Sequence, residues 1–321
     1  MRIPRVHLFE WHEKSWFPDL IRDQVTLLLM AVWRFDPPLP SILKPLYTAP
    51  YAAIFPTLVK TLELLRATTV CDLCSGGGGP TIKLARSMEK KLDIDVNFIL
   101  TDLYPNFSVI EHVNKKENNV MYCLHPVDAL SLTRETLNQI TSSPTQWGAG
   151  LRPVLPNENV LYTCFGSFHH FRPELAEEML RNLLTSIRFE EDEESETYNG
   201  ILIAEMSFRN WRSILGVVFL LPLFILLAST TVLFPHMTTI RFFYTFVLPV
   251  VPLTIVWDGV VSCLRTYTSE ELLAMAKKAT EQSSSIEFEW EYGEIQCLPF
   301  GLLGVNYFVG IPRKYVKPVK E

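Results

Sequence analysis

The sequence lacks the features that mark several common protein classes. It contains no long run of Lys and Arg, and the net charge of its 321 residues is −6. A protein that binds DNA or RNA needs a clustered basic face to meet the phosphates, so we expect no nucleic-acid partner. Only Cys71 and Cys74 form a C-x-x-C pair, and no second pair completes a zinc site. We therefore expect reduced cysteines, no metal and an intracellular, cytoplasmic location.

The N-terminus also lacks the pattern of a secretory signal. Residues 1–13 contain neither a long apolar stretch nor a cleavage-site pattern. With 48% hydrophobic residues, the chain has enough apolar material for one large core with additions, or for two modest domains. Without a basic face, the expected substrate is small or apolar.

Four consecutive glycines, Gly76 to Gly79, follow a short apolar run that ends on Asp72. A dinucleotide-binding loop needs G-x-G-x-x-G, but from Gly76 and Gly78 the third position falls on Thr81. A phosphate-binding P-loop needs Gly-Lys-Ser/Thr at its end, and Pro80-Thr81 stands there instead. Neither pattern fits. A helix pattern begins at Thr81, so the stretch predicts a strand, a glycine loop and a helix.

The spacing Asp72-x-Cys74-x-Gly76-x-Gly78 resembles motif I of the Rossmann-like S-adenosylmethionine-dependent methyltransferases. Cys74 stands where that family usually has its first glycine. The alternative is a glycine-rich turn without a ligand. The resemblance implies a cofactor-binding loop formed by Asp72, Cys74, Ser75, Gly76, Gly78 and Gly79.

Two more carboxylates follow successive predicted strands. Asp102 and Leu103 come after the strand at 96–101, at the place where doubly wound folds bind ribose hydroxyls. Asp128 and Ala129 follow a strand at 120–124 and resemble the family element that binds adenine. A helix N-cap is the alternative role for Asp102. Phe165 ends the next strand, at 159–165, and completes the predicted cofactor site.

The segment Ser167-Phe-His-His-Phe171 resembles the "-HHF-" variant of the family's motif IV. It follows the fourth strand, whose carboxyl end faces the methyl group of the cofactor in that family. His169 or His170 would be a general base or orient the substrate. The alternative is a histidine pair that caps the following helix, at 174–186.

The N-terminal region, 9–43, predicts helices joined by the Pro-rich turn at 36–40. Trp16 belongs to an apolar stripe of the first helix and is a candidate substrate-binding residue, although plain core packing is the favoured alternative. The stripe consists of Trp11, Trp16, Phe17, Leu20 and Ile21.

The runs 214–234 and 242–257 carry no charge. The first is long enough to span a bilayer, and the second contains Pro249 and Pro252. Membrane association through 214–257, as a hairpin or surface wedge, and a protein-buried lid both remain open. Asp258 and Arg265 follow the apolar runs and would be costly there unless they pair with each other or with a ligand. Asp258 is a further catalytic candidate and Arg265 a substrate-binding candidate, with a structural ion pair as the alternative.

These observations predict an α/β fold with a Rossmann-like, doubly wound, seven-stranded sheet whose last strand is antiparallel. We expect a helical cap at 1–65, an S-adenosylmethionine-binding core at 66–210, an apolar helical insertion at 211–265, and the end of the core at 266–321. The chain also resembles, over nearly its whole length, a group of uncharacterised methyltransferases. The resemblance implies methyl transfer to a small, hydrophobic acceptor. The alternative is a membrane-anchored scaffold that keeps the fold without catalysis. The oligomeric state stays open.

Overall fold

The computed structural model describes residues 3–34, 36, 40–42, 44–92, 96–105, 110, 119–132, 136, 158–186, 199–228, 238–283 and 287–313. They belong to two units. Unit 1 comprises Met1–Ala53, Glu205–Thr268 and Glu294–Asn306, and unit 2 comprises Ile54–Ala204, Ser269–Gly293 and Tyr307–Glu321. The acidic run 190–197 and the basic tail after Arg313 lie outside the described residues.

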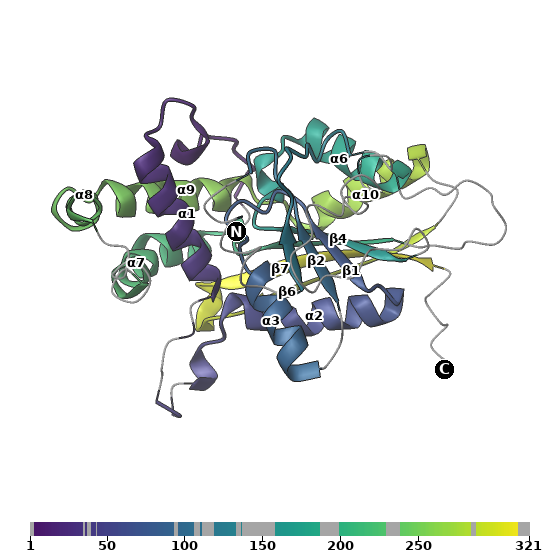
Figure 1. Cartoon of the computed structure of the whole chain (residues 1–321), viewed down its shortest axis with the longest axis horizontal. Helices are drawn as coiled ribbons and strands as arrows, with labels where there is room; N and C mark the ends of the chain where they lie inside the picture. The colour runs from purple at the N-terminus through teal and green to yellow at the C-terminus, as the bar shows by residue number, and fades with distance from the viewer. Residues whose placement is uncertain are drawn as a thin grey trace. The chain divides into compact units, whose positions relative to one another are not determined.

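A seven-stranded sheet has the order β3-β2-β1-β4-β5-β7-β6 (Figure 1). The first five strands pair in parallel, and the last strand is antiparallel, which confirms the predicted fold class. The strands are β1 Thr69–Asp72, β2 Asn97–Leu100, β3 Val120–Tyr122, β4 Val160–Phe165, β5 Gly200–Glu205, β6 Phe288–Gln296 and β7 Gly304–Pro312.

The strand order reverses between β1 and β4, which are direct neighbours in the sheet. In doubly wound sheets, ligands bind outside the carboxyl ends of the strands at such a reversal. Asp72, the last residue of β1, lies in register with Leu100 of β2 and Thr163 of β4. The glycine loop after β1 and the turn after β4 therefore stand on the two sides of the reversal, and Asp102 follows the neighbouring strand β2.

Helices cover both faces of this sheet, as the apolar character of its parallel strands requires. Every residue of β1, β2 and β5 is buried. Figure 1 shows α6 and α10 on one face, and α2 and α3 on the other. These helices are α2 Pro50–Leu65, α3 Thr81–Leu92, α6 Pro173–Ser186 and α10 Ser269–Ser283.

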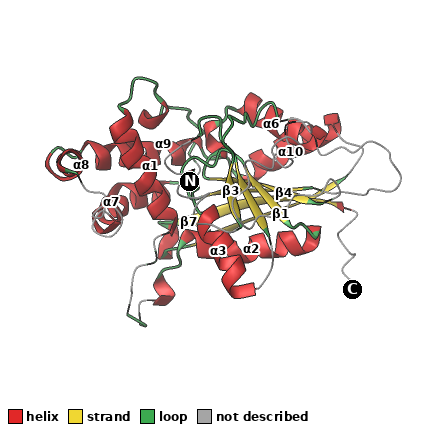
Figure 2. Cartoon of the chain, in the orientation of Figure 1, coloured by secondary structure: helices red, strands yellow, loops and turns green. Residues whose placement is uncertain are grey.

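Unit 1 is mainly helical (Figure 2). Its core is an apolar cluster between α1 and the first half of α9, made of Phe17, Ile21, Val25, Leu28, Val251 and Ile255. The elements of the unit are the 3₁₀ helices η1 Trp11–Glu13, η2 Lys44–Leu46 and η8 Pro299–Gly301, the α-helices α1 Asp19–Arg34, α7 Trp211–Ala228, α8 Thr239–Phe242 and α9 Val250–Arg265, and a π-helix at Phe243–Val247.

The first long helix begins later than the apolar stripe predicted. It starts at Asp19, so Trp11, Trp16 and Phe17 precede α1 and do not share a face of it. Pro18 is the physical reason, because a proline lacks an N–H and keeps the residue before it out of the helical region. Phe17 and Ile21 are nevertheless buried in the core of unit 1, whereas Trp16 is 66% exposed.

Among the described residues, no single helix is long and apolar enough to cross a membrane. Only the pair Thr239–Val247 and Val250–Arg265 passes that test together, and its two parts meet at an angle of 59°. The bend falls at Leu248 and Pro249, close to the proline pair that the sequence suggested would interrupt the second apolar run. The end of the first run, 229–234, lies outside the described residues.

Candidate functional site

The loop between β1 and α3 turns through residues with positive φ. Cys74, Gly76, Gly78 and Gly79 have φ values of 54°, 52°, 82° and 32°. Glycine adopts this left-handed region without steric cost, whereas a residue with a Cβ atom does so at a cost. The loop is therefore as tight as the motif predicted, and Cys74 makes the turn that the resemblance assigns to a glycine.

The Cys74 backbone predicts a gain in stability on substitution by glycine. A non-glycine residue in the left-handed region costs about 1–2 kcal/mol, and part of this gain is offset by the greater freedom of glycine in the unfolded chain. Cys74→Gly is expected to raise the free energy of unfolding by about 0.5–1 kcal/mol, measured by urea denaturation. Cys74→Ala keeps the Cβ atom and serves as the control. An equal gain from alanine would contradict the conformational explanation.

The glycines of the loop have two different surroundings. A Cβ atom on Gly78 would lie 2.8 Å from Ile82 Cδ1 and 3.1 Å from Leu100 Cδ2, so this glycine packs against the protein. A Cβ atom on Gly76 or Gly79 would meet nothing within 4 Å. The backbone at these two positions borders open space beside the strand reversal. That arrangement suits a ligand that must approach the main chain closely.

Asp72 lies beneath the loop and holds its shape. The carboxylate is buried and accepts hydrogen bonds from the hydroxyls of Ser75 (2.9 Å), Thr81 (2.7 Å) and Thr163 (2.7 Å). These three donors come from the loop, from the start of α3 and from β4. The geometry thus gives Asp72 a positioning role that joins the elements around the reversal.

Burial raises the pKa of Asp72 from 3.8 to about 6, although the hydrogen bonds from Thr81, Thr163 and Ser75 lower it and the charge of Asp102 raises it. Between pH 4 and 6 the folded state then binds more protons at this site than the unfolded state. Stability at this site is therefore lost as the pH rises through that range.

The raised pKa of Asp72 corresponds to a loss of about 3 kcal/mol in the free energy of unfolding as the pH rises through this range. Asp72→Asn cannot titrate and should lack this component. From pH 4 to pH 7, the free energy of unfolding of the wild type should therefore fall relative to that of Asp72→Asn. Urea denaturation at several pH values measures it. A difference that stays constant across this range would rule out a raised pKa at Asp72.

Asp102 joins the glycine loop to the loops that follow β2 and β3. Its Oδ2 accepts a hydrogen bond from Gly76 N (2.7 Å) and its Oδ1 accepts one from Tyr104 N (2.8 Å). Its carbonyl oxygen accepts from Val127 N (2.9 Å), which brings the third loop alongside. Burial raises the pKa of Asp102, while the bonds from Tyr104 and Gly76 and the charge of His170 lower it. One carboxylate thus lies at the meeting point of three loops.

The other predicted cofactor residues lie on these same loops. Leu103 is 42% exposed beside Asp102, and Ala129 is buried. Asp128 is partly exposed, and its Oδ1 accepts a hydrogen bond from Leu130 N (2.9 Å). Phe165 is buried at the end of β4. The structure brings Gly76, Asp102 and the 127–129 segment together, as the strand order predicted.

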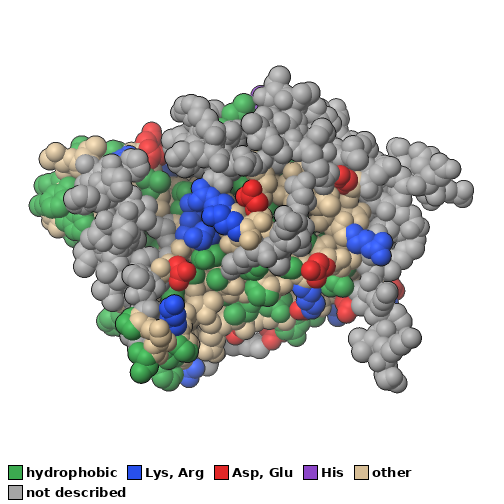
Figure 3. Space-filling model, turned by 60° about the horizontal axis from the view of Figure 1, so that its bottom comes forward, with side chains coloured by type: hydrophobic (Ala, Val, Ile, Leu, Met, Phe, Trp, Pro, Cys, Tyr) green, Lys and Arg blue, Asp and Glu red, His purple; other side chains and the backbone are tan. Residues whose placement is uncertain are grey.

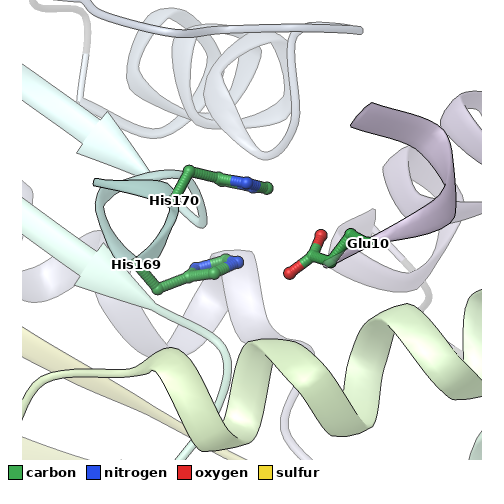
Figure 4. Close-up of side chains that lie close together, drawn as sticks. All are labelled: Glu10, His169 and His170. Carbon is green, nitrogen blue, oxygen red and sulfur yellow. The ribbon is translucent and has the colours of Figure 1, made fainter. Parts of the chain in front are cut away.

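The turn after β4 carries the two histidines. The 3₁₀ helix η4, Phe168–His170, follows Ser167, whose hydroxyl donates a hydrogen bond to the carbonyl of Cys74 (2.9 Å). This bond ties the turn to the glycine loop. His169 is buried and His170 partly exposed, and their ring centroids lie 4.3 Å apart at an interplanar angle of 31°. Figure 4 shows the two rings projecting from the turn in the same direction.

Asp258 and Arg265 lie on α9 in unit 1 and do not pair with each other. Asp258 accepts hydrogen bonds from Trp11 N (2.7 Å) and from His12 Nδ1 (2.8 Å). Arg265 donates to both carboxylate oxygens of Glu13 at 2.6 and 2.9 Å, and lies 3.3 Å from Glu10. Residues of the N-terminal segment therefore provide the partners that these two buried charges require. The sequence did not suggest this segment as a partner.

The segment 5–13 is attached to α9 along its length, and we call it the N-terminal strap. Trp257 Nε1 donates to Phe9 O (3.0 Å), and Ser262 donates to Glu10 Oε1 (3.1 Å). The ring of Trp16, just beyond the strap, meets Trp11 edge to face at 5.6 Å between centroids. The roles predicted for Trp16, Asp258 and Arg265 toward a substrate stay predictions, because their described contacts are within unit 1.

Glu10, His12 and Asp258 place one nitrogen and two carboxylate oxygens within 4.8 Å of one another, a spacing that a metal ion could use. The same atoms hold the strap to α9 through hydrogen bonds. Burial lowers the pKa of His12, but the hydrogen bond to Asp258 and the nearby charges of Glu10, Asp258 and Glu13 raise it overall. The nearby carboxylates therefore favour the protonated form of His12, whose Nδ1 donates to Asp258 Oδ2.

Sequence reasoning missed several residues that shape the glycine loop. Tyr122, at the end of β3, donates its hydroxyl to Gly76 O (2.6 Å), and Thr163 holds Asp72 from β4. A signal existed for Thr163, because it is a polar residue in an otherwise apolar buried strand, and such residues need a partner. Tyr122 carried no comparable signal, since a tyrosine at a strand end is commonplace.

No protein-family model and no curated protein matches the chain. Among solved structures, it is similar to the plantazolicin methyltransferase BpumL in complex with SAH, with 12% identity, a TM-score of 0.45, and coverage of 92% of this chain and 100% of that one. It is also similar to human N-acetylserotonin methyltransferase in complex with SAM, with 10% identity, a TM-score of 0.39, and coverage of 82% and 52%. Likenesses this weak carry no functional weight, and the strand order identifies the Rossmann-like fold.

Proposed function

We propose that this chain is an S-adenosylmethionine-dependent methyltransferase. The observation that carries the proposal is the contact between Gly76 N and the Asp102 carboxylate at the strand reversal. This contact joins the glycine loop, whose main chain borders open space, to an acid at the end of the next strand. Phosphate-binding loops have a different sequence ending, and dinucleotide-binding loops require a third glycine that is a threonine here.

The residues around this contact suit the three parts of S-adenosylmethionine. Gly76 and Gly79 would pass close to the methionine part, because their main chain borders open space. Asp102 would bind the ribose hydroxyls with the acceptor positions that remain on its two oxygens. Asp128, Ala129 and Leu103 would surround the adenine. Phe165 would close the site at the end of β4.

Bound S-adenosylmethionine supplies a methyl group that is already strongly electrophilic. The chain's own residues then need to hold the acceptor in line and keep water out. His169 and His170 follow β4 on a turn tied to the glycine loop through Ser167, so they are the candidates to orient the acceptor or to take its proton. We infer a small, hydrophobic acceptor, since the chain is acidic overall and the histidines stand between Phe168 and Phe171.

The test is methyl transfer from methyl-labelled S-adenosylmethionine to a panel of small lipophilic alcohols, phenols and amines, using the full-length protein. We expect labelled product with the wild type. The variants His169→Ala and His170→Ala should bind the cofactor normally, and at least one should lose about 10²-fold or more in turnover. His125→Ala, which changes a histidine outside the β4 turn, should leave turnover unchanged.

The outcomes separate the parts of this proposal. Full turnover in both histidine variants would remove His169 and His170 from the mechanism. Cofactor binding without transfer to any acceptor would favour the alternative, a non-catalytic protein that keeps the fold. Absence of cofactor binding by folded protein would contradict the proposal itself.

A further inference from the structure

The helices α7, α8 and α9 of unit 1, with the π-helix between α8 and α9, leave large apolar side chains exposed. Phe219 of α7, Val247 of the π-helix and Leu253 of α9 are 68%, 61% and 65% exposed. Single exposed apolar residues are ordinary, but a set on consecutive elements marks an interaction surface. We call this set the apolar surface of unit 1: Leu215, Val218, Phe219, Ile240, Phe242, Phe243, Phe246, Val247, Leu248, Leu253 and Trp257.

These side chains are distinct from the ones that build the core of unit 1. On α9, Val251 and Ile255 are fully buried against α1, whereas Leu253 and Trp257 are exposed. On the π-helix, Thr245 is buried, while Phe243, Phe246 and Val247 are exposed. A helix at the surface of a soluble protein normally turns polar residues outward. Here both the inward and the outward stripes are apolar, so the outward stripe needs another explanation than core packing.

The segment that forms this surface carries no acidic residue. No Asp or Glu occurs from Met206 to Trp257, although the chain as a whole has a net charge of −6. Arg212 is exposed at the start of α7, and Arg241 lies on α8 beside Phe242. Trp211 and Trp257 are also exposed. Tryptophan and arginine next to exposed aliphatic and phenyl groups are the residues that anchor proteins at the headgroup level of a bilayer.

From these observations we propose that the apolar surface of unit 1 docks on the surface of an anionic phospholipid bilayer. The α8 segment and the π-helix lie in the headgroup region with their exposed phenyl groups in the acyl chains, and Arg212 and Arg241 meet lipid phosphates. The 59° bend between the π-helix and α9 suits a segment that lies along the interface. In Figure 3, hydrophobic side chains gather at the left end, where Figure 1 places α8. This docking is independent of the proposed methyl transfer.

The test is flotation of the full-length protein with vesicles of phosphatidylcholine alone, or of phosphatidylcholine with 30% phosphatidylserine. We expect the wild type to float with the anionic vesicles and much less with the neutral ones. The double variant Phe243→Asp/Val247→Asp should lose binding more than tenfold, since its charges would enter the acyl region. The matched control is Ile42→Asp, because Ile42 is 83% exposed in the same unit but does not belong to α7, α8, the π-helix or α9.

A second variant addresses the charges without touching the apolar contacts. Arg212→Gln/Arg241→Gln should weaken binding to anionic vesicles by about fivefold for each arginine and leave binding to neutral vesicles unchanged. Circular dichroism and thermal unfolding check that each variant is folded. Equal flotation of wild type and Phe243→Asp/Val247→Asp would overturn the proposal. The absence of vesicle binding by the wild type would overturn it as well. If light scattering then showed a dimer that this double variant dissociates, the surface would be assigned to a second copy of the chain.

Discussion

Asp102→Ala is expected to weaken S-adenosylmethionine binding by a factor of about 10²–10³. A hydrogen bond to a charged acceptor contributes about 1.5–3 kcal/mol, and the carboxylate would accept one from each ribose hydroxyl. The variant also removes the acceptor for Gly76 N, which now fixes the loop at 2.7 Å. Isothermal titration of the wild type and the variant measures the ratio of their dissociation constants.

The matched control is Glu63→Ala, which removes the same charge from an exposed position on α2 in the same unit. Its affinity for the cofactor should equal that of the wild type. Thermal unfolding shows whether Asp102→Ala is folded, so that loss of binding is not mistaken for loss of structure. An unchanged dissociation constant in folded Asp102→Ala would contradict the role assigned to Asp102.

Arg265→Leu is expected to lower the free energy of unfolding by about 3–5 kcal/mol. Arg265 is 2% exposed and Glu10 is 1% exposed, so removing the guanidinium leaves a buried carboxylate without its cation. The bidentate pair with Glu13 and the bond from Arg265 Nε to Leu8 O (2.7 Å) are lost as well. Urea denaturation followed by tryptophan fluorescence measures the change.

Two further variants test the cause of this loss. The double variant Arg265→Leu/Glu10→Gln should regain part of the stability, because the buried carboxylate is then neutral. Arg313→Leu breaks an exposed pair with Glu287 and should leave the urea midpoint unchanged. If Glu10→Gln restored nothing in the Arg265→Leu background, the loss would have to come from packing alone.

The loops at the strand reversal could be predicted because their signals are local. Asp72, the glycines and Asp102 each stand within a few residues of a strand end, and parallel strands bring their carboxyl ends to one edge. The strand positions and the type of sheet followed from the same alternation. The hydrogen bonds that hold the glycine loop in place could not be predicted. Nothing near Tyr122 in the sequence indicates that its hydroxyl donates to the carbonyl of Gly76.

Unit 1 was harder to predict because its decisive contacts are distant in sequence. The requirement for partners at Asp258 and Arg265 was correct in physical terms, but the partners are His12, Glu10 and Glu13 at the other end of the chain. No periodicity or spacing relates these positions. The start of α1 was placed too early for a local reason, since Pro18 outweighs the apolar stripe around it.

The most direct test of the central claim is titration calorimetry of the full-length protein with S-adenosylmethionine and, separately, with NAD. The glycine loop without its third glycine and the Asp102 contact predict saturable one-to-one binding of S-adenosylmethionine at micromolar concentration or below. They predict no heat of binding with NAD. Binding of NAD, or no binding of S-adenosylmethionine by folded protein, would contradict the assignment of this site to a methyltransferase.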